Sequence, residues 1–237
     1  MKILIVGKGK MGSLLKTAAE AAGYTVTGMA DAFDLDAVNN AEPADMVIDF
    51  SHRDNLDWVT EYVRKNNSAL VYGTTGLSPE QKEQLNRLAE TNPVFFSANY
   101  SYGVAVLSAL IKTAAPLLKD SFDIELTETH HNQKQDAPSG TAKALLELLD
   151  PDNEFKKVYG REGMTGARQK EIGVHALRGG TEAGTHSIYF FGENESITIT
   201  HHADNRMIFV NGAIRAAAFL EGKEAGMYTM NDLLGGL

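Results

Sequence analysis

Short apolar runs alternate with helix-like segments over the first hundred residues. The run at residues 2–6 ends at a glycine, as is typical of a buried parallel strand, and further strands are expected over residues 25–30, 46–50, 69–72 and 94–97. Between them, residues 11–22, 55–65 and 79–90 have the composition of helices, and a capping box at Ser78 with Pro79 in the first turn opens the last of these. Strands that alternate with helices predict a parallel, doubly wound sheet.

The pattern changes after Gly103. An apolar helix is expected over residues 104–118, and apolar and polar residues then alternate over residues 122–129 and 196–202, with a further β-rich run at residues 184–191. Such alternation is typical of an open sheet with one face in water. Residues 150–166 are the most loop-like stretch, and residues 206–220 return to a helical pattern. The order of elements therefore predicts an α+β domain inserted before a returning helix.

Composition limits the classes of function. The 237 residues suit one large or two small domains, and a net charge of −9 argues against nucleic acid as a partner. The apolar residues 105–118 are interrupted by Lys112 and are too short to cross a bilayer, and the run at residues 3–6 is too short for a signal peptide. The absence of cysteine excludes thiolate chemistry and is compatible with a reducing cytoplasm, where we expect the protein to act.

A glycine-rich turn follows the first strand. Residues 7–12, with Gly7, Gly9 and Gly12 around Lys8, Lys10 and Met11, have the spacing G-x-G-x-x-G between a strand and a helix. This context favours dinucleotide binding, because the three glycines permit the tight turn, the approach of the pyrophosphate and close helix–strand packing. A glycine turn without a ligand is the alternative. Asp31 lies 19 residues after Gly12, where an acidic residue usually binds the adenosine ribose hydroxyls.

The fold class follows from these patterns together. We predict an α/β protein with a Rossmann-like doubly wound parallel sheet and a second α+β domain built on an open mixed sheet. Residues 1–102 plus 209–237 would form the dinucleotide-binding domain, and residues 103–208 a substrate-binding and oligomerisation domain. Asp31 favours NADH, because a carboxylate repels the extra phosphate of NADPH, whereas Lys8 and Lys10 are either solvated lysines or partners for that phosphate. NADH, NADPH or both are therefore expected.

Many polar and titratable residues lie close together in the segment from Glu128 to Ala142, ETHHNQKQDAPSGTA. His130 and His131 can exchange protons near neutral pH, and Lys134 carries a positive charge. Residues 139–141, Ser139, Gly140 and Thr141, stand at the expected start of a helix, whose backbone N–H groups bind anions. Each feature has a plainer interpretation: surface histidines, a solvated lysine and a loop with a helix cap. Their convergence in one short segment favours an anion site with proton transfer beside it.

This segment resembles the E-x-H-H-x-x-K-x-D-A-P-S-G-T-A signature of the 4-hydroxy-tetrahydrodipicolinate reductase (dihydrodipicolinate reductase) family. The resemblance extends to residues 49–51, 73–76, 97–103, 178–180, 184–186 and 201–206, with threonine in place of the family's glutamate at Thr185. In the family, two of these loops flank the nicotinamide half of the cofactor. The resemblance therefore implies cofactor binding by Gly73, Thr74, Thr75, Ser97, Ala98, Asn99 and Tyr100.

The resemblance also implies a reaction. The substrate would be a cyclic imine with two carboxylates and a ring hydroxyl, which NAD(P)H reduces to tetrahydrodipicolinate with loss of water, in lysine and diaminopimelate biosynthesis. By resemblance, His130 is the proton donor or acceptor and Lys134 a proton donor. His131 would contact the substrate, and Ser139, Gly140 and Thr141 would hold a carboxylate. The family is usually tetrameric through the second domain, so a homotetramer is expected.

Three other interpretations are kept. The first is another two-domain nicotinamide oxidoreductase of amino-acid metabolism, such as an aspartate dehydrogenase-like enzyme, which shares the glycine motif but not the histidine–lysine segment. The second is a nucleotide-sensing regulator with a dead active site. The third is a zinc site, in which His130 and His131 would need another ligand such as His186, His201 or His202; we expect no metal.

Overall fold

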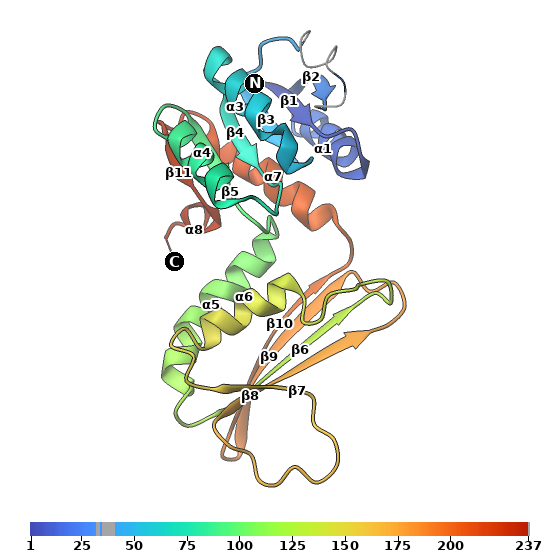
Figure 1. Ribbon diagram of the computed structural model, residues 1–237, viewed down its shortest axis with the longest axis vertical. Coiled ribbons are helices and arrows are strands. Elements are labelled where there is room, and N and C mark those ends of the chain that lie inside the picture. Colours follow the sequence, from blue (N-terminus) through green and yellow to red (C-terminus); the bar gives the residue numbers. More distant parts are fainter. Residues whose placement is uncertain (32–33, 35–40, 237) are drawn as a thin grey trace. The chain divides into compact units, whose positions relative to one another are not determined.

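The computed structural model describes residues 1–31, 34 and 41–236, which form two compact units (Figure 1). Unit 1 comprises Met1–Tyr102 and Met207–Leu237, and unit 2 comprises Gly103–Arg206. The chain returns to unit 1 with helix α7 (Met207–Leu220), two residues before the return at residue 209 that the sequence pattern indicated. None of the described helices is both long enough and apolar enough to cross a bilayer.

Unit 1 is built on a parallel sheet, as predicted. Its strands lie in the order β11-β5-β4-β3-β1-β2, and all pair in parallel. They are β1 (Lys2–Val6), β2 (Thr25–Ala30), β3 (Met46–Asp49), β4 (Ala69–Tyr72), β5 (Pro93–Phe96) and β11 (Gly226–Tyr228). The residues of β3 and β4 are all buried, because helices cover both faces of the sheet.

Helices α3 (Leu56–Asn66) and α4 (Pro79–Ala89) cover one face of this sheet, and α1 (Lys10–Ala21) and α7 cover the other (Figure 1). Short elements η1 (Arg53–Asn55) and α8 (Met230–Leu233) complete the unit. The predicted capping box of α4 is present: the Gln81 amide donates to Ser78 Oγ at 3.2 Å, and the Ser78 amide donates to Gln81 Oε1 at 3.0 Å.

The strand order places a topological switch point between β1 and β3. The chain moves from β1 to β2 on one side and then returns to β3 on the other side of β1. Ligands of open α/β sheets bind at such a switch point, outside the carboxyl ends of the strands. The glycine turn after β1 and residues 50–51 after β3 both lie there, since a Cβ on Gly7 would come within 2.9 Å of the Phe50 carbonyl oxygen.

Unit 2 holds a mixed sheet, as predicted. The strand order is β10-β9-β6-β8-β7; β6 pairs in parallel with β8 and antiparallel with β9. Its elements are α5 (Tyr102–Leu118), β6 (Asp123–His130), α6 (Gly140–Leu149), β7 (Lys156–Tyr159), β8 (Glu171–Arg178), β9 (Gly184–Gly192) and β10 (Glu195–Ala203). The first residue of α5 belongs to unit 1 and the rest to unit 2.

Helices α5 and α6 lie together on one face of this sheet (Figure 1). The apolar core between the helices and the sheet includes Leu107, Leu145, Ile124 and Ile188. Because side chains alternate along β6, Glu128 and His130 share the helix-covered face with Ile124 and Leu126, whereas Glu125 points to the opposite face. No described helix covers that opposite face.

Five of the described elements are absent from the sequence interpretation, and the short helix η1 is one of them. Strand β7 lies inside residues 150–166, which were expected to be the most loop-like stretch, and β8, β11 and α8 were not anticipated. Strand β8 lacks a clean alternation partly because of Gly173, where a Cβ would come within 1.8 Å of Glu125 Oε2. These segments become strands through pairing with distant neighbours, so the local pattern is a weak signal for them.

Candidate active site

The glycine turn of unit 1 has the geometry that a pyrophosphate requires. Gly7 has φ +110°, a conformation that glycine adopts without strain. A Cβ on Gly12 would come within 1.9 Å of the Gly7 carbonyl oxygen, so helix α1 can approach β1 only with glycine there. A Cβ on Gly9 would meet none of the described atoms within 4 Å, which leaves the N-terminus of α1 accessible. The turn therefore fits a dinucleotide.

The other predicted cofactor residues follow β2, β4 and β5 at the same edge. Asp31 comes directly after β2, and Gly73, Thr74 and Thr75 come directly after β4. A Cβ on Gly73 would come within 2.4 Å of the Phe50 ring, so this loop packs tightly against the end of β3. Lys8 forms an ion pair with Asp34, while Lys10 and Met11 open α1.

The loop after β5 is fixed by its own hydrogen bonds. The Ser97 hydroxyl donates to the Asn99 carbonyl at 2.7 Å, and the Ser101 amide donates to Asn99 Oδ1 at 2.9 Å. Tyr100 is only 2% exposed, and its hydroxyl donates to the carbonyls of Tyr72 and Phe95 at 3.0 and 3.1 Å. Its side chain therefore belongs to the core of unit 1, so we expect Tyr100 to reach a cofactor through its backbone alone.

Asp49 joins two of these loops. Its Oδ1 accepts from the Ser51 amide at 2.9 Å, the Ser51 hydroxyl at 2.6 Å and the Thr74 hydroxyl at 2.9 Å. The residue is fully buried, and Oδ2 has no hydrogen-bond partner in the part of the chain that the structure describes. Burial raises the pKa of Asp49 to about 6 and the charge of Asp31 adds to that, although the three hydrogen bonds lower it.

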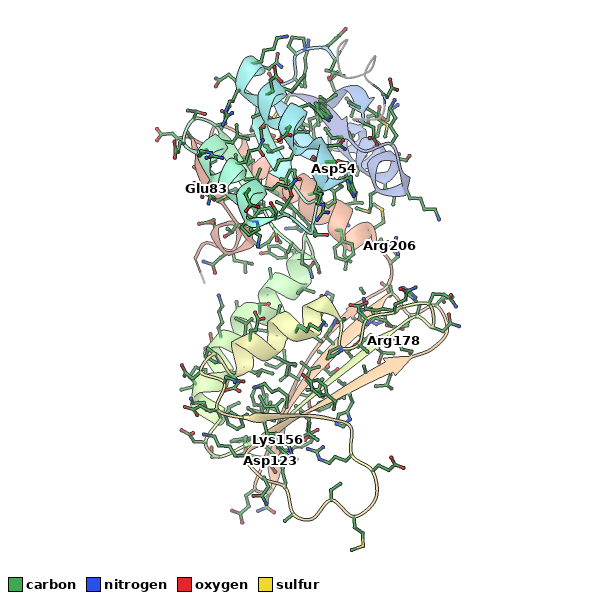
Figure 2. The ribbon with its side chains drawn as sticks, viewed as in Figure 1. Asp54, Glu83, Asp123, Lys156, Arg178 and Arg206 are labelled. Atoms are coloured by element: carbon green, nitrogen blue, oxygen red, sulfur yellow. The ribbon has the colours of Figure 1, made fainter. Side chains whose placement is uncertain are left out.

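In unit 2, the predicted proton donor His130 is the last residue of β6. Its Nδ1 lies 2.5 Å from Glu128 Oε2, and the Glu128 side chain is fully buried. Arg178, at the end of β8, donates two hydrogen bonds to the same carboxylate at 2.9 and 2.7 Å. Figure 2 shows Arg178 at one end of this sheet and Asp123 at the other. Burial raises the pKa of Glu128, but Arg178 and His130 outweigh that effect, so its pKa is lowered overall.

The start of helix α6 lies beside this pair. Ser139 is the N-cap, since its hydroxyl accepts from the Ala142 amide at 3.2 Å. The Ser139 amide donates to Glu128 Oε1 at 3.2 Å, so the cap is tied directly to the buried carboxylate. Gly140 and Thr141 follow as the first residues of the helix, and a Cβ on Gly140 would meet no described atom within 4 Å. This helix start fits an anion.

His186 on β9 completes the cluster. Its Nε2 lies 3.1 Å from Ser139 Oγ, and its ring is inclined at 76° to that of His130, with the ring centroids 5.2 Å apart. Burial, followed by the charge of His130, lowers the pKa of His186 to about 4, so this imidazole is neutral at pH 7. Glu128, His130 and His186 are near enough to share a metal ion, but the Arg178 guanidinium already engages both oxygens of Glu128. The cluster favours proton and anion chemistry.

Lys134 lies in the loop between β6 and α6. Its Nζ is 2.8 Å from Asp136 Oδ1, and this hydrogen bond lowers the pKa of the Asp136 carboxyl. The Asp136 carbonyl in turn accepts from Arg178 at 2.7 Å, which connects the lysine loop to the buried pair. His131 is half-buried directly after β6. The structure therefore gathers His130, Ser139 and the Lys134 loop around Glu128.

Glu128, Asp49 and Arg178 lie within the sequence motifs, but the motifs alone predict no role for them. The i, i+2 spacing of Glu128 and His130 on an alternating strand was the available signal, because it places both side chains on one face. Arg178 lies 50 residues from Glu128 in the sequence, and no local pattern connects the two. Of the other candidate histidines, His202 forms contacts with Thr185 at 2.7 Å and Glu182 at 3.2 Å instead.

Comparison with known proteins identifies relatives over the whole chain. The family described as dihydrodipicolinate reductase, N-terminus, matches residues 1–100, and that described as dihydrodipicolinate reductase, C-terminus, matches residues 103–234. The 4-hydroxy-tetrahydrodipicolinate reductase of Brachyspira hyodysenteriae is 42% identical over 237 residues, covering 99% of this chain and 100% of the relative. That of Staphylococcus epidermidis is 42% identical over 243 residues, covering 98% and 100%.

Solved structures with a similar fold include two enzymes. The dipicolinate-bound dihydrodipicolinate reductase from Paenisporosarcina sp. TG-14 aligns with a TM-score of 0.78 at 22% identity, covering 97% of each chain. The aspartate dehydrogenase of Thermotoga maritima aligns with a TM-score of 0.50 at 13% identity, covering 94% of this chain and 97% of that one. At these identities both similarities concern the fold alone.

The raised pKa of Asp49 predicts a pH dependence of stability. In the folded state its pKa is about 6, above an unfolded value near 3.8. The stabilisation from its protonated form is therefore complete below pH 4 and is lost as pH rises through 6. Asp49→Asn cannot titrate, so the free energy of unfolding of this variant should rise relative to wild type between pH 4 and 7. At about 1.4 kcal/mol per pKa unit, the change is on the order of 3 kcal/mol.

Denaturant unfolding followed by tryptophan fluorescence measures this difference, because the chain has one tryptophan, Trp58, on helix α3 of unit 1. Glu61→Gln on the same helix is a matched control, since Glu61 is exposed and should show little change. If the free energies of unfolding of Asp49→Asn and wild type differ by a constant amount over this pH range, the pKa of Asp49 is not raised in the folded state.

Proposed function

The chain belongs to the dihydrodipicolinate reductase family, and from that premise we propose that it reduces 4-hydroxy-tetrahydrodipicolinate to tetrahydrodipicolinate. The reaction consumes NAD(P)H and one proton and releases NAD(P)⁺ and water, and it serves lysine and diaminopimelate biosynthesis. The observation that carries the proposal is the cluster at the head of α6. There a histidine, a lysine loop and a helix N-terminus meet around one buried carboxylate.

His130 and Lys134 are the proposed proton-transfer residues. Negative charge moves toward the ring nitrogen of the imine as hydride arrives, and a proton donor there stabilises the transition state. Two observations support His130: Glu128 holds its Nδ1, and a Cβ on Gly184 would come within 3.0 Å of its Nε2. Glycine therefore leaves space beside the second ring nitrogen. Lys134 brings a positive charge to the same loop, partly balanced by Asp136.

The substrate carboxylates require local positive charge, because the chain as a whole carries a net charge of −9. The proposed carboxylate site is the N-terminus of α6, where Ser139, Gly140 and Thr141 supply backbone N–H groups and the helix dipole. His131 is proposed to contact the substrate from the end of β6. A dicarboxylate suits this arrangement better than a neutral imine, since Lys134 offers a second positive group nearby.

A nicotinamide dinucleotide fits unit 1. Gly7, Gly9 and Gly12 form the pyrophosphate turn, and the accessible N-terminus of α1 supplies backbone donors. We propose that Lys8, Lys10 and Met11 border the same turn, and that Asp31 accepts hydrogen bonds from the adenosine ribose. The loops with Gly73, Thr74 and Thr75 and with Ser97, Ala98, Asn99 and Tyr100 would hold the nicotinamide half. When bound, NAD(P)H supplies the hydride.

NADH is the preferred cofactor in this proposal. We propose that Asp31 binds the ribose hydroxyls, where its carboxylate would repel the phosphate of NADPH. The ion pair between Lys8 and Asp34 adds a second carboxylate next to one of the two lysines that could attract that phosphate. Both partners of this pair are about two-fifths exposed, so its attraction is modest. The net balance of charge around the ribose therefore favours NADH.

The other interpretations explain less of the structure. An aspartate dehydrogenase-like enzyme shares the fold but has no need for the histidine–lysine segment. A regulator without turnover would not require the Glu128–His130–Arg178 arrangement. We expect no resident metal, because the Arg178 guanidinium engages the carboxylate that a cation would need. A cytoplasmic location is proposed because the reaction draws on NAD(P)H and serves amino-acid biosynthesis.

We also propose that the uncovered face of the unit 2 sheet mediates a homotetramer. The rings of Tyr189 and Phe191 stack on that face with centroids 5.7 Å apart, and Phe191 is 45% exposed. Leu177, on the same face of β8, is 50% exposed. Exposed apolar side chains on an open sheet face are typical of a surface that a partner covers.

A coupled assay tests the proposed activity. The upstream synthase, supplied with pyruvate and aspartate semialdehyde, makes the imine substrate in place, and oxidation of NADH is followed by absorbance. His130→Gln and Lys134→Ala should each lower kcat at least ~100-fold, the lower range for losing a general acid. Binding of NADH, measured by fluorescence titration, should be nearly unchanged, because both residues lie outside unit 1.

Lys156→Ala is the matched control, since Lys156 is an exposed lysine on the edge strand β7 of the same unit and should leave kcat unchanged. Robust turnover of oxaloacetate plus ammonia, with none of the synthase product, would contradict the proposal and favour an aspartate dehydrogenase-like enzyme. Wild-type turnover in either purified variant would remove that residue from the mechanism.

Cofactor preference gives a separate prediction. At physiological salt, kcat/KM for NADH should equal or exceed that for NADPH, and NADPH use should fall more steeply as salt rises. Lys8→Ala combined with Lys10→Ala should impair NADPH selectively. Asp34→Ala should raise kcat/KM for NADPH, because it releases Lys8 from its ion pair. A tenfold or greater preference of the wild type for NADPH would show that the role given to Asp31 is wrong.

Light scattering after size-exclusion chromatography tests the assembly. The wild type should have a mass near four times the chain mass of 25.7 kDa. Phe191→Glu should lower that mass, because it places a charge in the proposed contact. Leu117→Glu, an equally large change at a residue of α5 that is 76% exposed, should leave the mass unchanged. A monomeric wild type at micromolar concentration would exclude the proposed tetramer.

A further inference from the structure

Glu128 makes four polar contacts through two oxygen atoms. Oε1 accepts from Arg178 at 2.7 Å and from the Ser139 amide at 3.2 Å. Oε2 accepts from Arg178 at 2.9 Å and lies 2.5 Å from His130 Nδ1. A fully buried carboxylate is costly unless it is paired and hydrogen-bonded, and here both conditions are met. The side chain is therefore an ionised acceptor.

An ionised acceptor determines which nitrogen of His130 carries the proton. A carboxylate cannot donate, so the short contact to Nδ1 requires a proton on that nitrogen. The second ring nitrogen, Nε2, is then the atom that can gain or lose a proton. It points toward Gly184, where a Cβ would come within 3.0 Å. The nitrogen that exchanges the proton is thus the one beside Gly184, where the absence of a side chain leaves space.

The same carboxylate connects three segments that the proposed reaction uses. Through its hydrogen bonds it holds the imidazole at the end of β6 and the N-cap of α6. Through Arg178 it reaches the Asp136 carbonyl, in the loop that carries Lys134. The proposed proton donor, the helix start proposed to bind an anion and the loop that carries Lys134 are therefore all connected to Glu128, directly or through Arg178.

We propose that Glu128, held by Arg178, is the positioning residue that fixes His130 with Nδ1 protonated, so that Nε2 exchanges the proton with the substrate. This inference rests on the proposed function and adds a residue that acts through His130 without touching the substrate. The attraction between the Glu128 carboxylate and a protonated His130 ring is one of the causes that lower the pKa of Glu128. The other charged or titratable groups around His130 are Arg178 on β8, the buried imidazole of His186 on β9, and Lys134 with Asp136 in the following loop.

Kinetics of Glu128→Gln test the role of the charge. The variant keeps the size of the side chain but loses its charge and disfavours the imidazolium, so kcat should fall at least ~10-fold, part of the value of a general acid. The decline of kcat/KM with rising pH should move to lower pH, while NADH affinity stays unchanged. Glu128→Asp keeps the charge, and it should recover most of the shift in the pH profile. A purely structural role for Glu128 would lower activity without moving that profile.

The chain offers a matched control on the same strand. Like Glu128, Glu125 contacts arginine and histidine side chains, although with two arginines in place of one: Arg161 at 2.8 Å, Arg168, and His175 at 2.9 Å. It lies on the opposite face of β6, away from the cluster. Glu125→Gln therefore removes an equivalent Glu–Arg–His contact and should leave the pH profile in place. The same shift in both variants would overturn the proposal.

Neutron diffraction from wild-type crystals at neutral pH tests the proton position without any substitution, so it decides the matter if Glu128→Gln does not fold. The expected result is a deuteron on His130 Nδ1 and none on Glu128. A deuteron on Nε2 with Nδ1 bare, or a protonated Glu128, would overturn the proposal. These results can be told apart from failure of the proposed function. In that case the wild type would not oxidise NADH with the synthase product.

Discussion

The buried carboxylate of Glu128 is the constraint on which unit 2 depends. Desolvation of an unpaired carboxylate would destabilise the fold by several kcal/mol, so the residue requires the Arg178 guanidinium at the end of β8. Besides the two hydrogen bonds from Arg178, the carboxylate oxygens accept hydrogen bonds from His130 Nδ1 and from the Ser139 amide. The groups proposed for proton transfer and carboxylate binding are therefore held by the same interaction that makes burial of the charge tolerable.

In unit 1, close backbone contacts at glycine residues fix the loops of the proposed cofactor site. Its switch point between β1 and β3 brings the glycine turn, the end of β3 and the loop after β4 so close together that Cβ atoms at Gly7, Gly12 and Gly73 would collide with neighbours. Asp49 adds hydrogen bonds to these contacts, because its Oδ1 accepts from the hydroxyls of both Ser51 and Thr74. Each unit thus uses a buried acidic residue on a strand to fix the loops that its ligand is proposed to touch.

Local patterns predicted the parts of the structure that local sequence determines. The glycine turn, the capping box at Ser78 and the amphipathic strand before His130 could be predicted because turn chemistry and periodicity act over a few residues. Strands β7 and β8 were not predicted, since their pairing partners are distant and Gly173 breaks the alternation to make room for Glu125. The role of Arg178 could not be predicted from its sequence motif. Its partner Glu128 is on another strand, and only the folded sheet brings the two together.

The central claim is that the Glu128–His130 pair and the start of α6 form one site for a cyclic dicarboxylate. A crystal structure of the chain with pyridine-2,6-dicarboxylate, a planar analogue that carries both carboxylates, tests it most directly. We expect one carboxylate on the backbone N–H groups of Gly140 and Thr141, with His130 Nε2 and Lys134 Nζ in hydrogen-bond reach of the dianion. A dianion bound elsewhere, or held through a metal ion on Glu128, His130 and His186, would contradict the claim.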